Sequence, residues 1–195
     1  RGWPKIAGGQ AQRVVDAIPQ EQLDALPLGR LDFIGMNIYN SVMVRAGADG
    51  KPEFCPRAAG HPRTAIGWPV TPESMEWGTR FIWERYGLPI YITENGISCT
   101  DCIYLDGKVH DPARIDFIHR YLLALRRAID SGVDVRGYFH WSLLDNFEWS
   151  EGYNERFGLI YVDYTTGKRT PKDSAAWYAK VAETNGRDLR HIINS

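Results

Sequence analysis

Glu94 is the residue of this sequence whose position most needs a chemical explanation. It follows the apolar and β-branched residues 89–92, which predict a buried strand, and it precedes Asn95-Gly96, a dipeptide typical of turns. An ionised carboxylate at the end of a buried strand is destabilising unless it is paired or hydrogen-bonded. Two interpretations stay open from the position alone: an ion pair that stabilises the loop, or a carboxylate that takes part in catalysis.

Polar and aromatic side chains also occur where two other predicted strands end. The strand ends and the loops after them contain an amide, a phenol, two indoles and a second carboxylate: Asn37, Tyr39, Trp141, Glu148 and Trp149. Carbohydrate sites need this mixture, because the C–H faces of sugars stack on indole rings and sugar hydroxyls bond to carboxylates and indole N–H groups. Singly, core packing explains Tyr39 and Trp141, and a solvated position explains Glu148. Jointly, the residues predict a carbohydrate site.

Three predicted strand–helix units position these residues. The strands are expected over residues 32–37, 89–92 and 135–141, and each following helix is expected to begin at a capping residue before proline: Thr71-Pro72, Asp111-Pro112 and Thr170-Pro171. The alternation of strand and helix predicts a parallel sheet with right-handed crossovers. The links after the strands are much longer than those before them, which places chemistry at the carboxyl ends of the strands, as in a (β/α)8 barrel.

Three units are too few to close a barrel, which needs eight of them and about 250 residues. The predicted fold class is therefore α/β, with residues 1–195 as the carboxyl-terminal part of a single TIM-barrel domain. We expect a missing amino-terminal segment, in a second chain or in the rest of a cut one, to supply the other strands. The first strand-to-helix turn has no glycine-rich phosphate loop, which counts against a doubly wound nucleotide-binding sheet.

The remaining segments are expected to be minor elements. A weak helix is predicted over residues 10–18, a short polar helix after Pro19, and a small extra strand over residues 40–45. Arg1 in place of an initiating Met fits a processed chain or one piece of something longer.

Composition excludes several classes of function. Lys and Arg number 23 against 24 Asp and Glu, so nothing favours nucleic acid or an anionic membrane surface as a partner. No apolar stretch is long enough to span a bilayer, and no signal peptide is visible. The three cysteines, including the lone pair Cys99 and Cys102, fit neither a disulfide framework nor a zinc site. We expect a cytoplasmic protein without metal or cofactor.

The motifs resemble glycoside hydrolase family 1, the β-glucosidase family. Residues 91–96 (YITENG) are similar to its nucleophile motif, residues 32–39 to its F-x-G-x-N-x-Y segment, and residues 137–149 to its sugar-binding segment. Residues 156–159 (RFGL) and 168–172 (KRTPK) follow the same pattern, in the family's order and over nearly the whole chain.

The resemblance implies a retaining mechanism. Glu94 would attack the anomeric carbon of a β-glucoside or a short β-linked oligosaccharide, and water would then hydrolyse the covalent glycosyl-enzyme. A hydrogen bond from Tyr39 would favour the charged form of the nucleophile. Asn37 would help to order polar groups near the scissile bond.

The resemblance also implies how the sugar is held. Glu148 would accept from the hydroxyls at C4 and C6, and Trp149 would donate to the hydroxyl at C3. Trp141 would form the floor under the ring, Phe157 a wall, and Trp68 part of the entrance, although loop packing explains Trp68 as well. An acid at residue 148 would repel a 6-phosphate, which favours unphosphorylated glucosides, with fucosides and galactosides still open.

One part of the family's machinery is missing from the sequence. The acid/base carboxylate belongs to a Thr-Asn-Glu-Pro-like segment, which does not occur here. A retaining enzyme needs two carboxyl groups about 5–5.5 Å apart, so activity is expected only of a completed barrel. The alternatives are a non-catalytic carbohydrate-binding or structural half-barrel, and an unrelated barrel enzyme acting on phosphorylated ligands.

Overall fold

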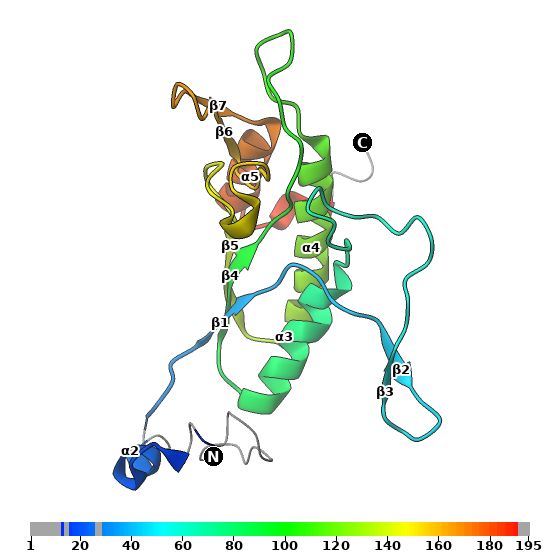
Figure 1. The fold of residues 1–195 in the computed structure, drawn as a ribbon, viewed down its shortest axis with the longest axis vertical. Helices are drawn as coiled ribbons and strands as arrows, with labels where there is room; N and C mark the ends of the chain where they lie inside the picture. The colour runs from blue at the N-terminus through cyan, green and yellow to red at the C-terminus, as the bar shows by residue number, and fades with distance from the viewer. Residues whose placement is uncertain (1–12, 14–15, 26–28, 191–195) are drawn as a thin grey trace.

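Three parallel strands form the centre of the structure, a computed structural model that describes residues 13, 16–25 and 29–190 (Figure 1). The strands are β1 (Ile34–Asn37), β4 (Ile90–Asn95) and β5 (Val135–His140), in the order β1-β4-β5. Both pairs are parallel, which confirms the sheet predicted from the alternation of elements. Within the described residues β1 and β5 each pair with β4 alone, so each keeps one unpaired edge.

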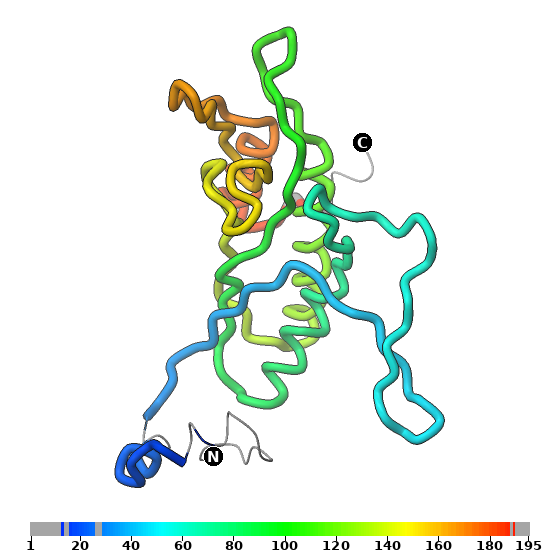
Figure 2. Tube along the Cα trace, viewed as in Figure 1, coloured from blue at the N-terminus to red at the C-terminus, as the bar shows by residue number. Residues whose placement is uncertain are grey.

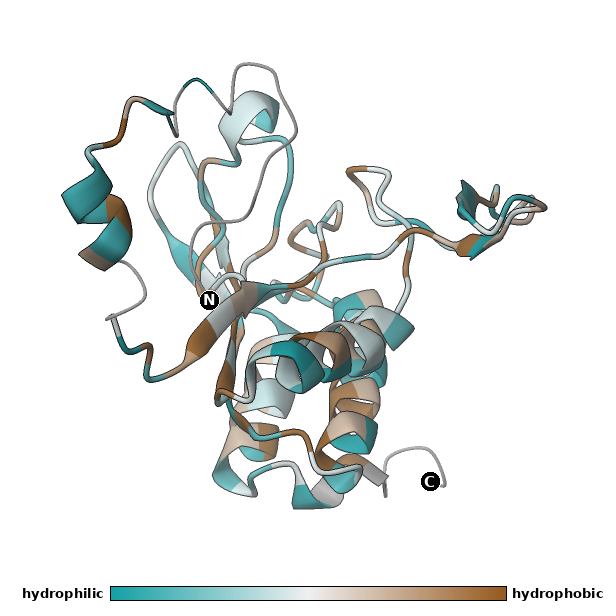
Figure 3. Cartoon of the chain, turned by 90° about the horizontal axis from the view of Figure 1, so that it is seen from below, coloured by the Kyte–Doolittle hydropathy of each residue, from teal (hydrophilic) through white to brown (hydrophobic). Residues whose placement is uncertain are grey.

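Helices α3 (Glu73–Tyr86), α4 (Pro112–Asp130) and α5 (Asp173–Glu183) lie together on one side of the sheet (Figures 1 and 3). Ile90 and Ile92 of β4 are fully buried and belong to the same core cluster as Met75 of α3 and Ile118 of α4. Alternate residues of a strand point to opposite faces, so this core lies on the helix side of the sheet. None of the helices in the described part of the chain is long and apolar enough to cross a membrane.

The other side of the sheet is open. Thr93 on β4 is exposed, Phe139 on β5 is 57% exposed, and Phe33 beside β1 is 54% exposed, with its ring 5.1 Å from that of Tyr91. A sheet of a monomeric protein rarely exposes aromatic side chains on a face that has no covering layer. The arrangement is that of part of a barrel, whose interior face this would be.

The two predicted helix caps at Thr71 and Asp111 are not formed by side-chain bonds. The hydroxyl oxygen of Thr71 instead accepts a hydrogen bond from the backbone N–H of Ser41 at 2.9 Å. The carboxylate of Asp111 accepts from the N–H of Ser174 at 2.8 Å, and so binds the start of α5 rather than that of its own helix. Tertiary partners compete successfully for both side chains.

The third predicted helix start is wrong. Thr170 and Pro171 belong to strand β7 (Arg169–Pro171), which pairs antiparallel with β6 (Ile160–Val162), and α5 begins only at Asp173. Gly167, at φ 72°, supplies the left-handed residue of the turn between these strands. The two strands have three residues each and are joined by a six-residue turn, so the sequence pattern alone does not reveal this hairpin.

The smaller elements are not part of this sheet. β2 (Val44–Ala46) pairs with β3 (Pro52–Phe54) in a projecting hairpin, so the predicted extra strand exists but begins later than residue 40 (Figure 2). The short helix after Pro19 is α2 (Gln20–Ala25), and 3₁₀ turns η2 (Trp149–Glu151) and η3 (Arg187–Arg190) follow later. Most of the predicted helix over residues 10–18 lies outside the described residues.

Candidate active site

Glu94 and Tyr39 form a hydrogen-bonded pair at the carboxyl ends of β4 and β1. The phenol Oη of Tyr39 donates to Oε2 of Glu94 at 2.7 Å. Burial, together with the hydrogen bond to the Glu94 carboxylate, holds the pKa of Tyr39 well above its ordinary value. Tyr39 therefore keeps its proton and stays a donor, and it leaves Oε1 of Glu94 without a bond from this phenol.

Backbone contacts fix the position of this pair. The N–H of Ile38 donates to the carbonyl of Glu94 at 2.9 Å, one step beyond the shift in register between β1 and β4. The hydroxyl of Tyr121, on α4, donates to the carbonyl of Tyr39 at 2.8 Å. The bulge and the two bonds bring together residues that lie 55 positions apart in the sequence.

Aromatic rings surround Tyr39. Its ring lies 5.2 Å from that of Trp68 and 6.3 Å from that of Phe157, both edge to face, and the latter two rings are 6.1 Å apart. The structure thus places Trp68 beside the pair. Phe157 is only 2% exposed, and its ring packs against the rings of Tyr39 and Trp68.

Trp141 and Glu148 contact one another at the carboxyl end of β5. The indole Nε1 of Trp141 donates to Oε2 of Glu148 at 3.4 Å. Burial raises the pKa of Glu148, the indole N–H opposes this, and the charge of Glu94 raises it further. Trp141 lies next to the end of β4, since its N–H donates to the carbonyl of Asn95, so Glu148 lies at the strand end beside that of Glu94. Trp149, next in the chain, is 80% exposed and has a positive φ of 42°.

Asn37 is hydrogen-bonded to a residue of the neighbouring strand. Its Oδ1 accepts from the hydroxyl of Thr93 at 2.7 Å, across β1 and β4. Asn37 remains exposed at the strand end, and its register partner is Glu94. The structure therefore places it at the mouth, next to the carboxylate but not hydrogen-bonded to it.

Asn95 is a site residue that the sequence interpretation assigned to a turn. It is the last residue of β4 and is fully buried, with its Nδ2 donating to the carbonyl of Ile38 at 2.8 Å and its Oδ1 accepting from Tyr138 at 2.7 Å. One amide thereby ties β4 to the segment after β1 and to β5. The signal for this role was its place directly after Glu94 in a strand of buried residues.

Gly96 allows the backbone of Trp141 to approach the end of β4 closely. A Cβ at this position would lie 1.8 Å from the carbonyl oxygen of Trp141. The N–H of Trp141 in turn donates to the carbonyl of Asn95 at 2.8 Å. The dipeptide Asn95-Gly96 is thus not a turn but the contact that brings Trp141 beside the Glu94 strand.

The geometry supports recognition of a sugar and attack on it. One mouth contains a carboxylate with a fixed phenol donor, a second carboxylate with an indole donor, and an exposed indole. No group of three or more His, Cys, Asp or Glu side chains among the described residues is arranged to hold a metal ion.

The chain is similar to known glycosidases in sequence and in fold. The chain is 46% identical over 160 residues to β-glucosidase A of Thermotoga maritima, covering 80% of this chain and 35% of that protein. It is 40% identical over 175 residues to a 6-phospho-β-galactosidase of Leptotrichia buccalis, covering 78% of this chain and 37% of that protein. The solved β-glucosidase from Thermotoga maritima in complex with glucoimidazole superposes with a TM-score of 0.77 at 42% identity.

The superposition covers 90% of this chain and 40% of the solved one, so the chain corresponds to part of that protein. It spans little more than a third of the length of the two relatives named above. A family model described as glycosyl hydrolase family 1 matches residues 5–187. The chain belongs to glycosyl hydrolase family 1.

Proposed function

We propose that this chain is the carboxyl-terminal part of a retaining β-glucosidase, with Glu94 as the nucleophile. The observation that carries the proposal is the bond from the Tyr39 phenol to Oε2 of Glu94, at a mouth that also presents Glu148. A carboxylate held by one donor through one oxygen is oriented for attack through the other. The β-glucosidases among the relatives support the choice of glycoside.

In the proposed reaction, Oε1 of Glu94 bonds to the anomeric carbon as the bond to the leaving oxygen breaks. A second carboxylic acid protonates that oxygen and then deprotonates the water that releases the sugar. We infer that this residue comes from the amino-terminal segment that completes the barrel, which is the partner of this chain. The work of Tyr39 is to keep Glu94 in place in both steps, since the raised pKa of the phenol keeps it protonated.

Glu148 and the indoles recognise the sugar in this proposal. Glu148 accepts from the hydroxyls at C4 and C6, while Trp141 holds Glu148 and lies under the ring, and Trp149 donates to the hydroxyl at C3. The carboxylate of Glu148 disfavours a 6-phosphate, because the like charges repel. We therefore prefer unphosphorylated β-glucosides in the cytoplasm to the substrate class in the name of the Leptotrichia buccalis relative.

The nucleophile is tested by Glu94→Gln in the completed barrel. Release of 4-nitrophenol from its β-glucoside should fall by at least about 10³-fold, because no carboxylate is left to attack. Glu84→Gln, on the exposed part of α3, is the matched control and should keep full activity.

A second variant distinguishes a nucleophile from a residue that only supports folding. In Glu94→Ala, azide can enter the vacated space and attack the anomeric carbon directly, which yields α-glucosyl azide and free 4-nitrophenol. Near-normal hydrolysis by Glu94→Gln, or recovery of a β-configured product with azide, would remove the assignment. Inactivity of the unaltered barrel would favour the non-catalytic half-barrel.

A further inference from the structure

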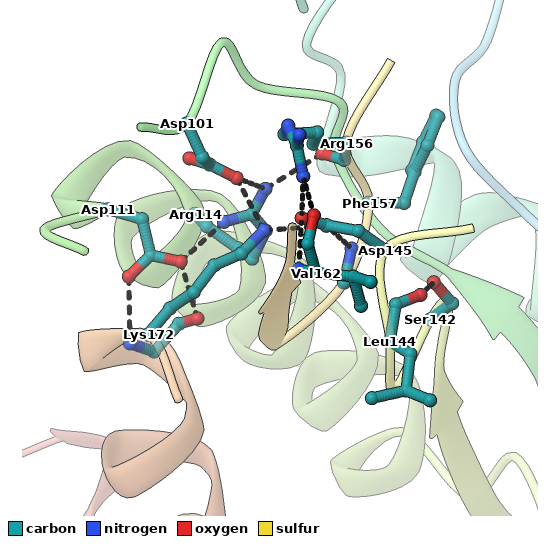
Figure 4. A network of polar contacts seen from close by, with 12 residues as sticks. Asp101, Asp111, Arg114, Ser142, Leu144, Asp145, Arg156, Phe157, Val162 and Lys172 are labelled. Carbon is teal, nitrogen blue, oxygen red and sulfur yellow. Dashed lines mark hydrogen bonds and ion pairs between the residues drawn. The ribbon is translucent and has the colours of Figure 1, made fainter. Parts of the chain in front are cut away.

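A buried network of charges connects the loops that follow β4 and β5 (Figure 4). It contains three carboxylates and three cations, so its formal charges cancel: Asp101, Asp111, Asp145, Arg114, Arg156 and Lys172. Five of the side chains are at most 4% exposed, and Arg156 is 15% exposed. Burying ions is costly even when they are paired, so gain in stability alone is a weak reason for such a network.

Lys172 joins the loops that follow two neighbouring strands. Its Nζ lies 2.5 Å from Oδ2 of Asp101 and 2.8 Å from Oδ1 of Asp145, and its side chain is fully buried. Asp101 belongs to the loop after β4, the strand of Glu94, and Asp145 to the loop after β5. A single ammonium group therefore fixes the two loops relative to one another.

Asp145 is the fixed point of the loop that carries the sugar-binding residues. Besides Lys172, its carboxylate accepts from Nη1 of Arg156 at 2.6 Å and from the N–H of Gly158 at 2.9 Å. A Cβ on Gly158 would lie 2.2 Å from the backbone nitrogen of Asp145, which shows how closely the two segments approach. Asp145 stands between Trp141 and Glu148 in the sequence, so it fixes the middle of the segment that carries Glu148.

The loop that contains Asp101 is fixed on the side of Glu94. Ser98 is 1% exposed, and the N–H of Cys99 donates to the carbonyl of Arg156 at 3.0 Å. Nη2 of Arg114 donates both to Asp101 at 2.6 Å and to that same carbonyl at 2.9 Å. These bonds restrict the backbone between β4, the strand of Glu94, and Asp101, whose carboxylate Lys172 binds.

We infer that Lys172 is a positioning residue that sets the separation of Glu148 from Glu94. Through Asp145 and Asp101 it couples recognition of the C4 and C6 hydroxyls to attack at the anomeric carbon, a role that rests on the proposed function. Displacement of a recognition group by about 1 Å can cost about a hundredfold in rate, so the coupling matters for catalysis.

The test uses the completed barrel and Lys172→Met, which keeps the length of the side chain and removes its charge. The kcat/KM of the variant for 4-nitrophenyl β-glucoside should fall about 10- to 100-fold more than that for the β-xyloside, which has no C6 hydroxyl for Glu148 to bind. Lys168→Met makes the same substitution at an exposed position four residues earlier and should change neither value.

A second variant controls for the possibility that Lys172→Met does not fold. Asp101→Asn with Lys172→Met removes one charge of each sign and leaves the pairs Arg114–Asp111 and Arg156–Asp145, so no unpaired ion is buried. This double variant should fold and should show the same selective loss on the glucoside. Equal losses on the glucoside and the xyloside would identify a merely structural role and overturn the inference.

Crystal structures of the unaltered and doubly substituted barrels supply a readout that does not depend on turnover. The distance between the carboxylates of Glu94 and Glu148 should differ between them, and an unchanged distance would overturn the inference. An unaltered barrel that hydrolyses neither substrate would instead contradict the proposed function, while the structural comparison would still decide the role of Lys172.

Discussion

A single phenol binds one oxygen of Glu94 and leaves the other for the attack proposed above. Tyr39 is held by its own backbone contact to Tyr121 and by the rings of Trp68 and Phe157, so its hydroxyl has little choice of position. A hydrogen bond to a charged group contributes about 1.5–3 kcal/mol, more than a typical bond between neutral groups. The effect of removing it is therefore measurable without loss of the fold.

The variant Tyr39→Phe removes only the hydroxyl and leaves the ring contacts with Trp68 and Phe157. The kcat/KM of the completed barrel for an aryl β-glucoside should fall about 10- to 100-fold, because the nucleophile loses its orienting donor. Steady-state kinetics measure this directly. Tyr86→Phe, on the exposed end of α3, is the control, and equal activity of both variants would contradict the role of Tyr39.

His140 predicts how stability depends on pH. Burial, with the charge of Arg114 nearby, lowers its pKa to about 3, from an ordinary value of 6.5. Between these pH values the unfolded chain binds a proton that the folded chain does not, so the free energy of unfolding rises with pH across this window. The slope should reach about 1.4 kcal/mol per pH unit.

Urea unfolding of the completed barrel between pH 4 and pH 7 tests this expectation. The variant His140→Gln should lose part of the slope, because it has no imidazole to protonate. His110→Gln should instead lower the free energy of unfolding about equally over the acid part of this range, since Asp173 and Asp106 raise the pKa of His110 and its stabilising effect is lost only above the ordinary pKa of 6.5. An unchanged slope in His140→Gln would show that its imidazole does not dominate the acid sensitivity.

At the scale of elements, the site depends on how closely the end of β5 approaches the end of β4. Asn95 binds both neighbours of β4, and Gly96 leaves room for the carbonyl of Trp141. The floor of the proposed sugar site is thus attached to the strand of Glu94 through a contact that tolerates no side chain.

The variant Gly96→Ala tests that contact. Its Cβ would overlap the Trp141 carbonyl, so the free energy of unfolding should fall by about 2–3 kcal/mol and activity should fall further as Trp141 moves. Gly78→Ala is the matched control on α3, where a Cβ meets only Ile38 at 3.7 Å. Denaturant titration should show that variant to be as stable as the unaltered protein or more so. Equal stability of both variants would contradict the argument.

The sequence predicts the elements better than it predicts their ends. Three strands and three helices follow from apolar runs and helix start and stop signals, whereas the bond between Tyr39 and Glu94 is what the resemblance to the family implies. The roles of Thr71 and Asp111 could not be predicted, because their partners Ser41 and Ser174 are distant in the sequence. Local capping rules cannot rank a distant partner against a near one.

The contacts of Lys172 could not be predicted either, because its partners are also distant in the sequence. Lys172 lies in a segment that resembles the family's pattern, yet nothing in the sequence indicates that its ammonium group meets Asp101, 71 residues away. Asn95 was misassigned because Asn-Gly is a strong turn signal, and the bonds that keep it in β4 come from β5 and from the segment after β1.

At the scale of the whole molecule, apolar surface is open where a barrel would continue. A groove of about 450 Å³ runs along β1 and α3, and its lining includes Trp77 and Phe81, which are 46% and 61% exposed. Phe33 and Phe139 are exposed beside the unpaired strands. Unpaired strand edges with apolar neighbours favour association between chains.

The isolated chain of 195 residues should therefore aggregate or form oligomers at micromolar concentration. Co-expression with the amino-terminal segment of a β-glucosidase of this family should convert it to a discrete soluble species, because the added strands cover both edges. Light scattering after gel filtration measures the masses. A stable monomer of the isolated chain would contradict the need for completion.

The central place of β4 in the sheet has a consequence for chimaeras made with amino-terminal segments of other proteins. The residues that hold the end of β4, Tyr39 after β1 and Tyr138 on β5, both belong to this chain, whereas the proposed proton donor comes from elsewhere. A chimaera that joins this chain to a foreign amino-terminal partner would inherit its preference for the sugar from one parent. Its choice of leaving group would come from the other.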